Sequence, residues 1–505
     1  MFYQYPFLFT LLISFFTLIS LKLIITGSFS EKLNLPPSPP KLPIIGNLHQ
    51  LGQLLHRSLH KLSLKYGPLM YLRLGYTPVL VVSSAELIRE IKTTHEISFG
   101  NRPATTAARM LFYGCVDLVF SPCGEYWRQI RKISASEMMS NKKVHSFKSV
   151  RDEEVALLTK KISTSCSVGT SVNISELVTD IVYDIMCRCA LGRKLGAQDG
   201  HLKEISPNLV KLLVAFSFGD LFPWLGWMDV LTGLIGRIKK VSKELDIFFD
   251  HIIDEHLIQN KEGGPDGYNN DFVDTLLQVQ MDNINFTRNN IKAIILDLFV
   301  GGTETTSSVI EWVMAELMMN PHTMQKAQEE VRRVVGKNNK VEEEDIQHMY
   351  YLKLVVMESL RLHPPVALLP METTTITNVN SYHVPAKTNV VVNIWAIHRD
   401  PNLWERPEEF IPERFSNSPI GFNGQDFKYI PFGSGRRMCG GILFSTILLE
   451  LVIANLLYWF DWRTLGDAEL DMTEDYGLTV SKKLPIHLLP VSHFPSTVKT
   501  DSLKY

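Results

Sequence analysis

Cys439 is the cysteine whose sequence surroundings most favour chemistry. It follows a glycine-rich stretch that begins at Phe432, and an apolar run that predicts a helix begins near Ile442. A helix N-terminus and the adjacent Arg436 and Arg437 favour negative charge, so we expect the sulfur to be held as a thiolate. A thiolate is the form of cysteine that binds haem iron, and glycines let the backbone approach a flat macrocycle. A cysteine near glycines is by itself more often structural, so other motifs must decide.

Three motifs, taken together, give the chain a family resemblance. They are Phe432-x-x-Gly435-x-Arg437-x-Cys439-x-Gly441, Glu358-Ser359-Leu360-Arg361 and Pro412-Glu413-Arg414-Phe415, and they resemble the cysteine, E-x-x-R and P-E-R-F motifs of the cytochrome P450 superfamily. The resemblance implies that Cys439 binds the iron of haem b (iron protoporphyrin IX), with Phe432 and Gly441 beside the cofactor. It also implies an ion-paired triad of Glu358, Arg361 and Arg414. From spacing alone, Glu358 and Arg361 would be only a surface pair worth about 0.2–0.5 kcal/mol.

Two glycines and adjacent polar residues interrupt the apolar helix predicted over residues 291–319. Such residues weaken a helix, so Gly301-Gly302-Thr303-Glu304-Thr305-Thr306 needs a functional reason or marks a structural kink. The segment resembles the oxygen-binding groove of P450 proteins. By that resemblance Gly301 makes room beside the iron, Thr305 hydrogen-bonds dioxygen, and Glu304 relays protons for O–O cleavage, which is work for a general acid.

The cofactor's carboxylates need cationic partners. Trp127 and Arg131 are one helical turn apart and are similar to the family's haem-propionate contacts. Arg437 is the expected second cation, because a guanidinium binds a carboxylate bidentately. Met371 stands where relatives usually carry Arg, so we expect one propionate partner to be missing and haem retention to be weaker. Gly440 stands where Pro is commoner, which should loosen the turn after the ligand.

The resemblance also suggests a substrate pocket with apolar walls and a few hydroxyl groups. Such walls suit a lipophilic molecule, although some of these side chains could equally belong to the core. The predicted pocket residues are Thr106, Phe112, Phe299, Gly301, Val366, Ala367, Leu368, Leu478 and Thr479.

Composition places the chain among globular proteins that bind small molecules. The 505 residues are 45% hydrophobic and 21% charged, with a net charge of −2, which excludes a broad basic surface for nucleic acid. Six cysteines are too few for a disulfide framework and fit a reducing compartment. Cys187 and Cys189 lie in an apolar segment and are expected to be core residues.

The N-terminal region is predicted to be a separate unit. Residues 1–34 contain an uncharged apolar stretch of about the ~20 residues that span a bilayer, which favours a transmembrane helix over a cleaved signal peptide. Residues 35–41 form a proline-rich hinge, and residues 42–505 form a single catalytic domain. Lysines after the span favour a cytosolic body, held by a single-pass anchor.

The secondary structure is predicted to be mainly α with small β-sheets (α+β), as in the P450 fold. Apolar runs at 71–75 and 79–82 predict a hairpin, and strand signals return at 382–393 and 484–489. The polar stretch at 260–270 predicts a loop. Apolar spacings of three and four predict helices at 153–162, 241–258, 291–319, 324–335, 351–362 and 443–460.

Finer detail, including Lys65-Tyr66-Gly67-Pro68 and Tyr126-Trp127-Arg128-Gln129, resembles the plant A-type P450s of the seventy-one clan. This resemblance implies a monooxygenase of the endoplasmic reticulum membrane, using O2 and electrons from NADPH–cytochrome P450 reductase. The favoured substrate is a terpenoid or terpenoid-indole alkaloid, with a coumarin or phenylpropanoid as another choice, oxidised by hydroxylation or oxidative ring formation. The alternatives are a haem–thiolate isomerase or dehydratase that does not use O2, and an inactive haem-binding protein.

Overall fold

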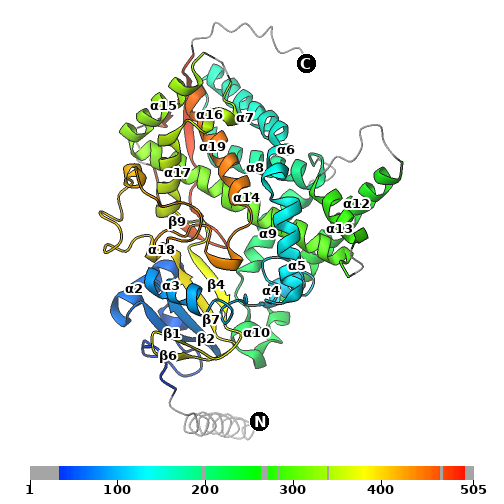
Figure 1. The fold of residues 1–505 in the computed structure, drawn as a ribbon, viewed down its shortest axis with the longest axis vertical. Coiled ribbons are helices and arrows are strands. Elements are labelled where there is room, and N and C mark those ends of the chain that lie inside the picture. The colour runs from blue at the N-terminus through cyan, green and yellow to red at the C-terminus, as the bar shows by residue number, and fades with distance from the viewer. Residues whose placement is uncertain are drawn as a thin grey trace, which may run out of the picture.

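Helices are the main secondary structure of the described residues, whose strands form four small sheets (Figure 1). The computed structural model describes residues 33–195, 201–262, 271–282, 285–337, 340–466 and 470–494. The prediction of a mainly α protein with small β-sheets is confirmed. The division into an anchor, a hinge and one catalytic domain stays a prediction, because residues 1–32 lie outside the described part of the chain.

The largest sheet has its strands in the order β1-β2-β7-β4. These are β1 (Leu69–Leu74), β2 (Thr77–Val82), β4 (Leu368–Glu372) and β7 (Asn389–Asn393). The β1–β2 pair is the predicted hairpin, turned by Gly75 with a φ of 60°. β2 pairs in parallel with β7, whereas β4 pairs with β7 antiparallel. This sheet therefore joins the first part of the catalytic body to its last third.

A long buried helix, α14 (Arg288–Met319), runs through the helical part of the molecule (Figure 1). Its N-terminus is fixed by a capping box between Thr287 and Asn290. It packs against α8 (Ile174–Leu191), α17 (Tyr350–Leu362) and α19 (Ile442–Trp459). Cys187 and Cys189 on α8 are fully buried, as predicted for core residues.

The six predicted helices fall within α7, α12, α14, α15, α17 and α19, except that Phe460 begins a strand. The predicted strand signals correspond to β6, β7 and β11. The loop predicted at 260–270 begins too early, because α12 continues to Glu262, and residues 263–270 lie outside the described residues. The remaining helices are η1 (Leu48–Gln50), α2 (Leu55–Tyr66), α3 (Ala85–Thr94), α4 (Thr106–Leu111), α5 (Glu125–Ile133), the π-helical η2 (Ser134–Met138), α6 (Asn141–Ser146), α7 (Lys148–Val168), α9 (His201–Leu213), α10 (Phe218–Leu221), η4 (Pro223–Leu225), α11 (Met228–Leu231), α12 (Leu234–Glu262), α13 (Phe272–Asp282), α15 (Pro321–Val335), α16 (Glu343–Ile346), α18 (Ile394–Ile397), η5 (Pro412–Phe415) and η6 (Gly435–Arg437). The remaining strands are β3 (Val172–Asn173), β5 (Thr377–Val379), β6 (Tyr382–Val384), β8 (Phe460–Thr464), β9 (Glu474–Tyr476), β10 (Val480–Lys482) and β11 (His487–Ser492).

Two of the described helices, α14 and α19, are long and apolar enough to cross a membrane. Most of their apolar stretches are buried inside the protein, 72% and 61% respectively, as expected of core helices. They therefore do not substitute for the predicted N-terminal anchor.

Candidate active site

Cys439 lies on a tight turn between η6 and α19. Gly433 and Gly435 have φ angles of 75° and 71°, which glycine adopts without strain. The Cys439 N–H donates to the Phe432 carbonyl at 3.0 Å, and the Gly441 N–H donates to the Cys439 Sγ at 3.3 Å. Cys439 has exposed surface, although surrounding protein desolvates its sulfur. The turn therefore presents the sulfur to space within the protein.

The charges near Cys439 differ from those predicted. Burial raises the pKa of the Cys439 thiol, and the Gly441 N–H and the charge of Arg131 lower it by less. Arg436 pairs instead with Glu96, with 3.2 Å between Nε and Oε2, and Arg437 binds backbone carbonyls. Arg436 and Arg437 therefore do not place their charges at the sulfur as the sequence predicts, and the nearby cation is Arg131. Bound metal would deprotonate the thiol directly.

Gly440 makes room for Arg131, which reaches this turn from α5. The Arg131 Nη2 donates to the Met438 carbonyl at 2.7 Å. A Cβ at position 440 would lie 3.0 Å from the Arg131 Nη1, so a larger residue would push the guanidinium aside. Gly440 thus has a packing role beyond the looser turn that the sequence predicts.

The two glycines of α14 serve different purposes. Gly302 lets α8 approach closely, because a Cβ there would lie 2.9 Å from the Met186 Cε. Gly301 is exposed although Phe299 and Val300 before it are buried, and a Cβ there would meet no atom within 4 Å. Gly301 therefore borders open space on a helix that packs against α19, the helix after Cys439.

Glu304 and Thr305 lie on α14 just after these glycines. Burial raises the pKa of Glu304 to about 7, so the carboxyl group exchanges its proton near neutral pH. The Thr305 Oγ1 donates a hydrogen bond to the Gly301 carbonyl. Thr305 must release this carbonyl before it can donate to another acceptor, whereas its oxygen can accept without rearrangement.

Trp127 and Arg437 lie against each other, and both are anchored to the loop before α5. The Arg437 guanidinium lies 4.5 Å from the centre of the Trp127 ring. The Trp127 Nε1 donates to the Leu118 carbonyl at 3.1 Å, and Arg437 donates through Nη1 to Val119 at 2.9 Å and through Nη2 to Ser121. Two of the three predicted carboxylate partners are thus brought together, and their polar groups are partly used by the loop.

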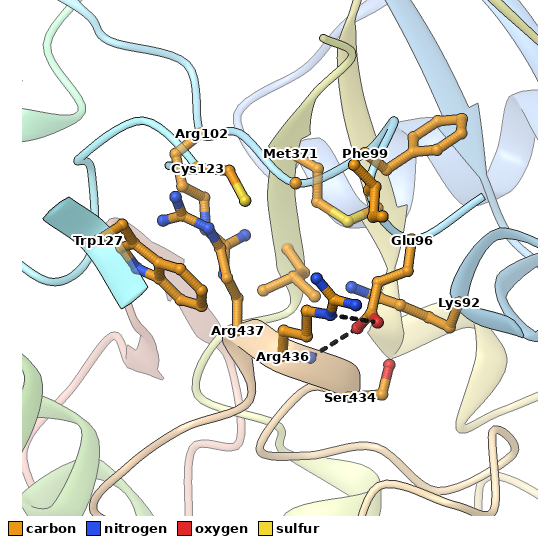
Figure 2. A pocket seen from close by; sticks show the side chains of 13 residues that line it. Lys92, Glu96, Phe99, Arg102, Cys123, Trp127, Met371, Ser434, Arg436 and Arg437 are labelled. Atoms are coloured by element: carbon orange, nitrogen blue, oxygen red, sulfur yellow. Dashed lines mark hydrogen bonds and ion pairs between the residues drawn. The ribbon is translucent and has the colours of Figure 1, made fainter. Parts of the chain in front are cut away.

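Figure 2 shows a pocket lined by Lys92, Arg102, Trp127, Met371 and Arg437, among others. Burial lowers the pKa of Lys92 to about 8 and those of Arg102 and Arg437 to about 10 each. The Nε atoms of Arg102 and Arg437 are buried and have no hydrogen-bond partner among the described residues. The pocket therefore holds excess positive charge and unused donors, which suit an anion.

Lys92 and Arg102 were not predicted from the sequence. Lys92 lies on α3 and Arg102 on the segment after it, and no spacing along the chain connects them to Arg437. The structure places both beside Met371, where a cation was expected to be missing. Arg102 also donates to the Pro370 carbonyl next to Met371. The positive charge beside Met371 therefore comes from α3 and the segment after it.

The predicted triad of Glu358, Arg361 and Arg414 is present. Glu358 accepts from the Arg361 Nε and Nη2 at 2.8 Å each and from the Arg414 Nε at 2.9 Å. The side chains of Glu358 and Arg361 are 0% exposed, so this is a buried network rather than a surface pair. The Arg361 Nη1 also donates to the carbonyls of His398 and Pro407. The triad thus ties α17 to η5 and the segment before it.

The predicted pocket residues occupy several environments. Gly301, Val366 and Leu478 keep accessible surface, whereas Phe112 and Phe299 are buried in the main core. Other members are engaged elsewhere, as follows: the Thr106 Oγ1 donates to Asp220 of α10 at 2.7 Å, Ala367 packs with Trp395, Ala396 and Val480, and Leu368 packs on the sheet against Leu59, Met70 and Leu72.

Thr479, the last of the predicted pocket residues, is buried. Its Oγ1 has no hydrogen-bond partner among the described residues. The grouping of these nine residues into one substrate pocket stays a prediction.

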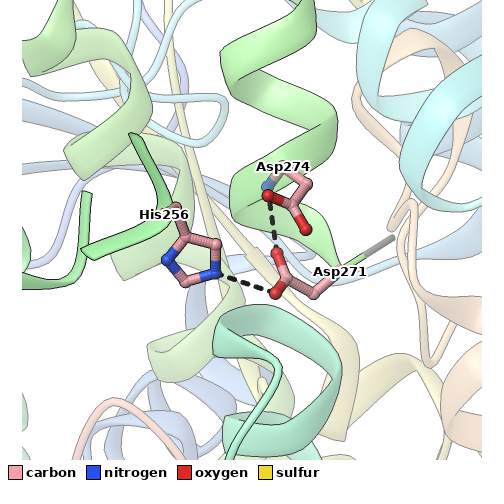
Figure 3. Close-up of side chains that lie close together, drawn as sticks. All are labelled: His256, Asp271 and Asp274. Atoms are coloured by element: carbon pink, nitrogen blue, oxygen red, sulfur yellow. Dashed lines mark hydrogen bonds and ion pairs between the residues drawn. The ribbon is translucent and has the colours of Figure 1, made fainter. Parts of the chain in front are cut away.

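Figure 3 shows another cluster of potential metal ligands, His256, Asp271 and Asp274. Both ring nitrogens of His256 are engaged, Nε2 with Asp271 at 2.9 Å and Nδ1 with the Ile252 carbonyl at 2.8 Å. A ring with two hydrogen-bond partners of this kind is a protonated donor rather than a metal ligand. The cluster joins α12 to α13.

These features fit haem. An exposed cysteine residue on a glycine turn suits a soft metal ligand, and open space at Gly301 leaves room beside a helix. The unpartnered donors of Arg102 and Arg437 suit two carboxylates at one edge of the group. The donor set therefore matches a flat, dicarboxylate iron cofactor.

Comparison with known proteins agrees with the fold and these features. A model of the cytochrome P450 family matches residues 36–489, and the chain therefore belongs to the cytochrome P450 family. The structure of a zebrafish cytochrome P450 with abiraterone has a TM-score of 0.73 and 24% sequence identity to this chain, covering 87% of this chain and 100% of that one. This likeness shows the P450 fold.

Curated plant proteins are more similar in sequence. Desmethylyatein synthase of Sinopodophyllum hexandrum is 49% identical over 95% of this chain and 98% of its own length. Cytochrome P450 71A1 of Persea americana is 50% identical over 89% of this chain and 91% of its own. Costunolide synthase of Cichorium intybus is 43% identical over 91% and 93%. The protein is a haem-containing P450 monooxygenase of plant secondary metabolism, which acts on a small molecule with O2 and a redox partner.

Proposed function

We propose that this monooxygenase oxidises a lipophilic plant metabolite, with a terpenoid or terpenoid-indole alkaloid favoured over a coumarin or phenylpropanoid. The reaction is hydroxylation or oxidative ring formation, with electrons from NADPH–cytochrome P450 reductase. The observation that carries the proposal is the position of Cys439, an exposed residue on a glycine turn just before α19. Similarity to costunolide synthase and desmethylyatein synthase supports a specialised metabolite as substrate.

The residues around the turn would hold the cofactor. Cys439 would ligate the iron, and Phe432 and Gly441 would lie beside the macrocycle. The carboxylates would lie beside Trp127 and would be bound by Arg131 and Arg437, together with Lys92 and Arg102 from the pocket of Figure 2. When bound, haem supplies the iron that activates dioxygen. The protein contributes the hydrogen-bond donors for the carboxylate edge of the haem and the open space beside Gly301 of α14.

Glu304 and Thr305 are proposed to manage protons. With a pKa of about 7, Glu304 can bind a proton and release it at Oε without a large change in free energy. The Thr305 hydroxyl, now bonded to the Gly301 carbonyl, would turn to donate towards the open side of α14. Neither side chain can substitute for the other, because the carboxyl group exchanges a proton and the hydroxyl positions one.

We also propose that residues 1–34 anchor the protein in the endoplasmic reticulum membrane, followed by the hinge at residues 35–41, with the catalytic domain in the cytosol. Large apolar side chains on η4, on α11 and at the N-cap of α11 are exposed, including Trp224 at 51%, Leu231 at 74% and the N-cap residue Trp227 at 58%. In Figure 1 the neighbouring α10 lies at the same end of the molecule as β1, β2 and the start of the described chain. Aromatic side chains of this kind favour a membrane interface.

The decisive experiment is the carbon-monoxide difference spectrum of the reduced protein and of a Cys439→Ser variant. We expect a thiolate-ligated spectrum that the variant loses, and an unchanged spectrum in the variant would refute the ligand assignment. Membranes holding the protein and the reductase should then be incubated with terpenoids, alkaloids and coumarins. An NADPH-dependent product from one class identifies the substrate, and a product formed without O2 would contradict the monooxygenase reaction.

A further inference from the structure

The loop at residues 116–121, here called the anchor loop, holds both Trp127 and Arg437 through its carbonyl groups. Just before it, Tyr113 and Cys115 have φ angles of 52° and 64°, which cost free energy in residues other than glycine. The conformation of the anchor loop is therefore imposed by contacts rather than by local preference.

Two carboxyl groups bind the N–H groups of the anchor loop. Asp297 reaches it from α14, and its Oδ2 accepts from the Leu118 N–H at 2.7 Å. Asp117 belongs to the loop, and its Oδ2 accepts from Val119 at 3.0 Å and Phe120 at 2.7 Å. Asp117 is fully buried, with 0% of its surface exposed. The loop is thus fixed to the helix that carries Glu304.

The two carboxyl groups also hydrogen-bond to each other. Two ionised carboxylates have only acceptors, so one of them must carry a proton. The Asp117 Oδ1 has no other donor among the described residues. Burial and the charge of Asp117 hold the pKa of Asp297 well above its usual range. Asp297 is therefore the protonated partner, and its carboxyl group donates to Asp117.

We propose that Asp297 is a positioning residue, whose hydrogen bond to Asp117 holds the anchor loop in the conformation that places Trp127 and Arg437 at the carboxylate edge of the haem. This inference rests on the proposed function, because it assumes the assignment of Trp127 and Arg437. It connects the helix that carries Glu304 to the pocket of Trp127 and Arg437 through one shared proton.

Three other ionisable groups near the pair keep their protonation state around neutral pH. Burial and the two aspartates raise the pKa of Cys115 to about 11, and burial raises that of Tyr126 to about 12. Burial lowers the pKa of Arg437 to about 10, although the charge of Asp117 raises it. Burial lowers the pKa of Lys92 in the carboxylate pocket to about 8, so Lys92 titrates in both proteins. A difference between wild type and Asp297→Asn from about pH 6 to pH 9 therefore reports the aspartate pair.

The test compares Asp297→Asn with Asp297→Ala in the full-length, haem-loaded protein. An Asn side chain can donate to Asp117 and accept from Leu118, so haem transfer to apomyoglobin should stay within about twofold of the wild-type rate. Ala removes both hydrogen bonds, and transfer should accelerate about tenfold or more. Asp282→Asn, on the exposed face of α13, is the control for loss of a carboxyl group. Equal haem loss from the Asn and Ala variants would overturn the proposal.

A pH series supplies a second readout, which stands even if the Ala variant does not fold. As pH rises and Asp297 loses its proton, two adjacent carboxylates repel, so wild-type haem transfer should accelerate and its Tm should fall relative to Asp297→Asn. Identical pH profiles for the two proteins would refute the shared proton.

Arg437→Ala separates this inference from the proposed function. If that variant transfers haem at the wild-type rate, the assignment of Arg437 to the carboxylates is wrong. The difference in Tm between wild type and Asp297→Asn across pH would still report the aspartate pair, because that measurement does not depend on Arg437 binding haem.

Discussion

Glu304 is a carboxylic acid whose surroundings set its proton affinity near neutral pH. Burial raises its pKa to about 7, so the protonated fraction falls as pH rises through that value. For the wild type, we therefore expect the amount of product formed per NADPH consumed to fall as pH rises over the same range. In Glu304→Gln, turnover to product should drop by about 10²-fold and lose this pH dependence.

Glu311→Gln is the matched control for that prediction. Glu311 lies on the same helix, is also buried with a raised pKa, and accepts a hydrogen bond from Ser175. It should leave the ratio of product to NADPH unchanged. Equal loss in both variants would show that any charge removed from α14 disturbs the reaction, and that Glu304 has no special part in proton transfer.

We expect the buried ion pairs of Glu358 to contribute more to the free energy of unfolding than exposed ion pairs do. Glu358→Gln leaves the buried Arg361 and its neighbour Arg414 without their shared carboxylate, which should cost about 3–5 kcal/mol. Arg406→Ala breaks a pair with Glu409 in which both side chains are more than half exposed, and should cost about 0–1 kcal/mol. Chemical denaturation of the two variants measures the difference, and similar losses would contradict the buried role.

Residues that belong to short motifs could be predicted from the sequence, and those brought in from elsewhere could not. Cys439 and the triad are defined by spacings of a few residues, which the backbone keeps. Lys92 and Arg102 enter the site only because α3 packs near the cysteine turn. The charges around the sulfur were also misjudged, since Arg436 has a partner in Glu96 that spacing does not reveal.

At the scale of elements, the contact between α12 and α13 should depend on pH. Burial alone would lower the pKa of His256, but the hydrogen bond and charge of Asp271 raise it to about 9. The contribution to stability is therefore fully present below pH 6.5, the ordinary pKa, and is lost as pH rises through about 9. His256→Gln should cost about 3 kcal/mol at pH 6 and little above pH 10.

His251→Gln is the control, because His251 is 64% exposed beside Glu255 on the same helix. Its effect on thermal unfolding should be small at every pH. A constant difference in Tm between wild type and His256→Gln from pH 6 to pH 10 would show that the histidine is not charged in the folded protein.

Helices were predicted more fully than sheet pairings. A helix such as α14 is encoded locally, by apolar spacing and a capping box, so its position could be predicted closely. The parallel pairing of β2 with β7 depends on tertiary packing, and no local pattern specifies it. The anchor loop was likewise missed as a structural unit, because its contacts come from α14 and from the cysteine turn.

At the scale of the whole molecule, the exposed side chains of η4 and α11 predict membrane contact in addition to the N-terminal segment. A chain lacking residues 1–34 should still bind phospholipid vesicles. Trp224→Ser combined with Trp227→Ser should weaken that binding by roughly tenfold or more, since each indole loses its apolar contact. Sedimentation with vesicles measures it, and Trp459→Phe, a partly buried position on α19, is the control. Unchanged binding would exclude this surface as a membrane contact.

The pairing of β2 with β7 has a consequence for biosynthesis. Residues near position 80 must wait for residues near 390 before the sheet can close, and the iron ligand emerges from the ribosome later still. Such distant pairings form slowly and leave apolar surface open in the meantime. Capture of the porphyrin is therefore a late event in the life of the nascent chain, and a shortage of porphyrin would leave an almost complete polypeptide exposed to chaperones and proteases.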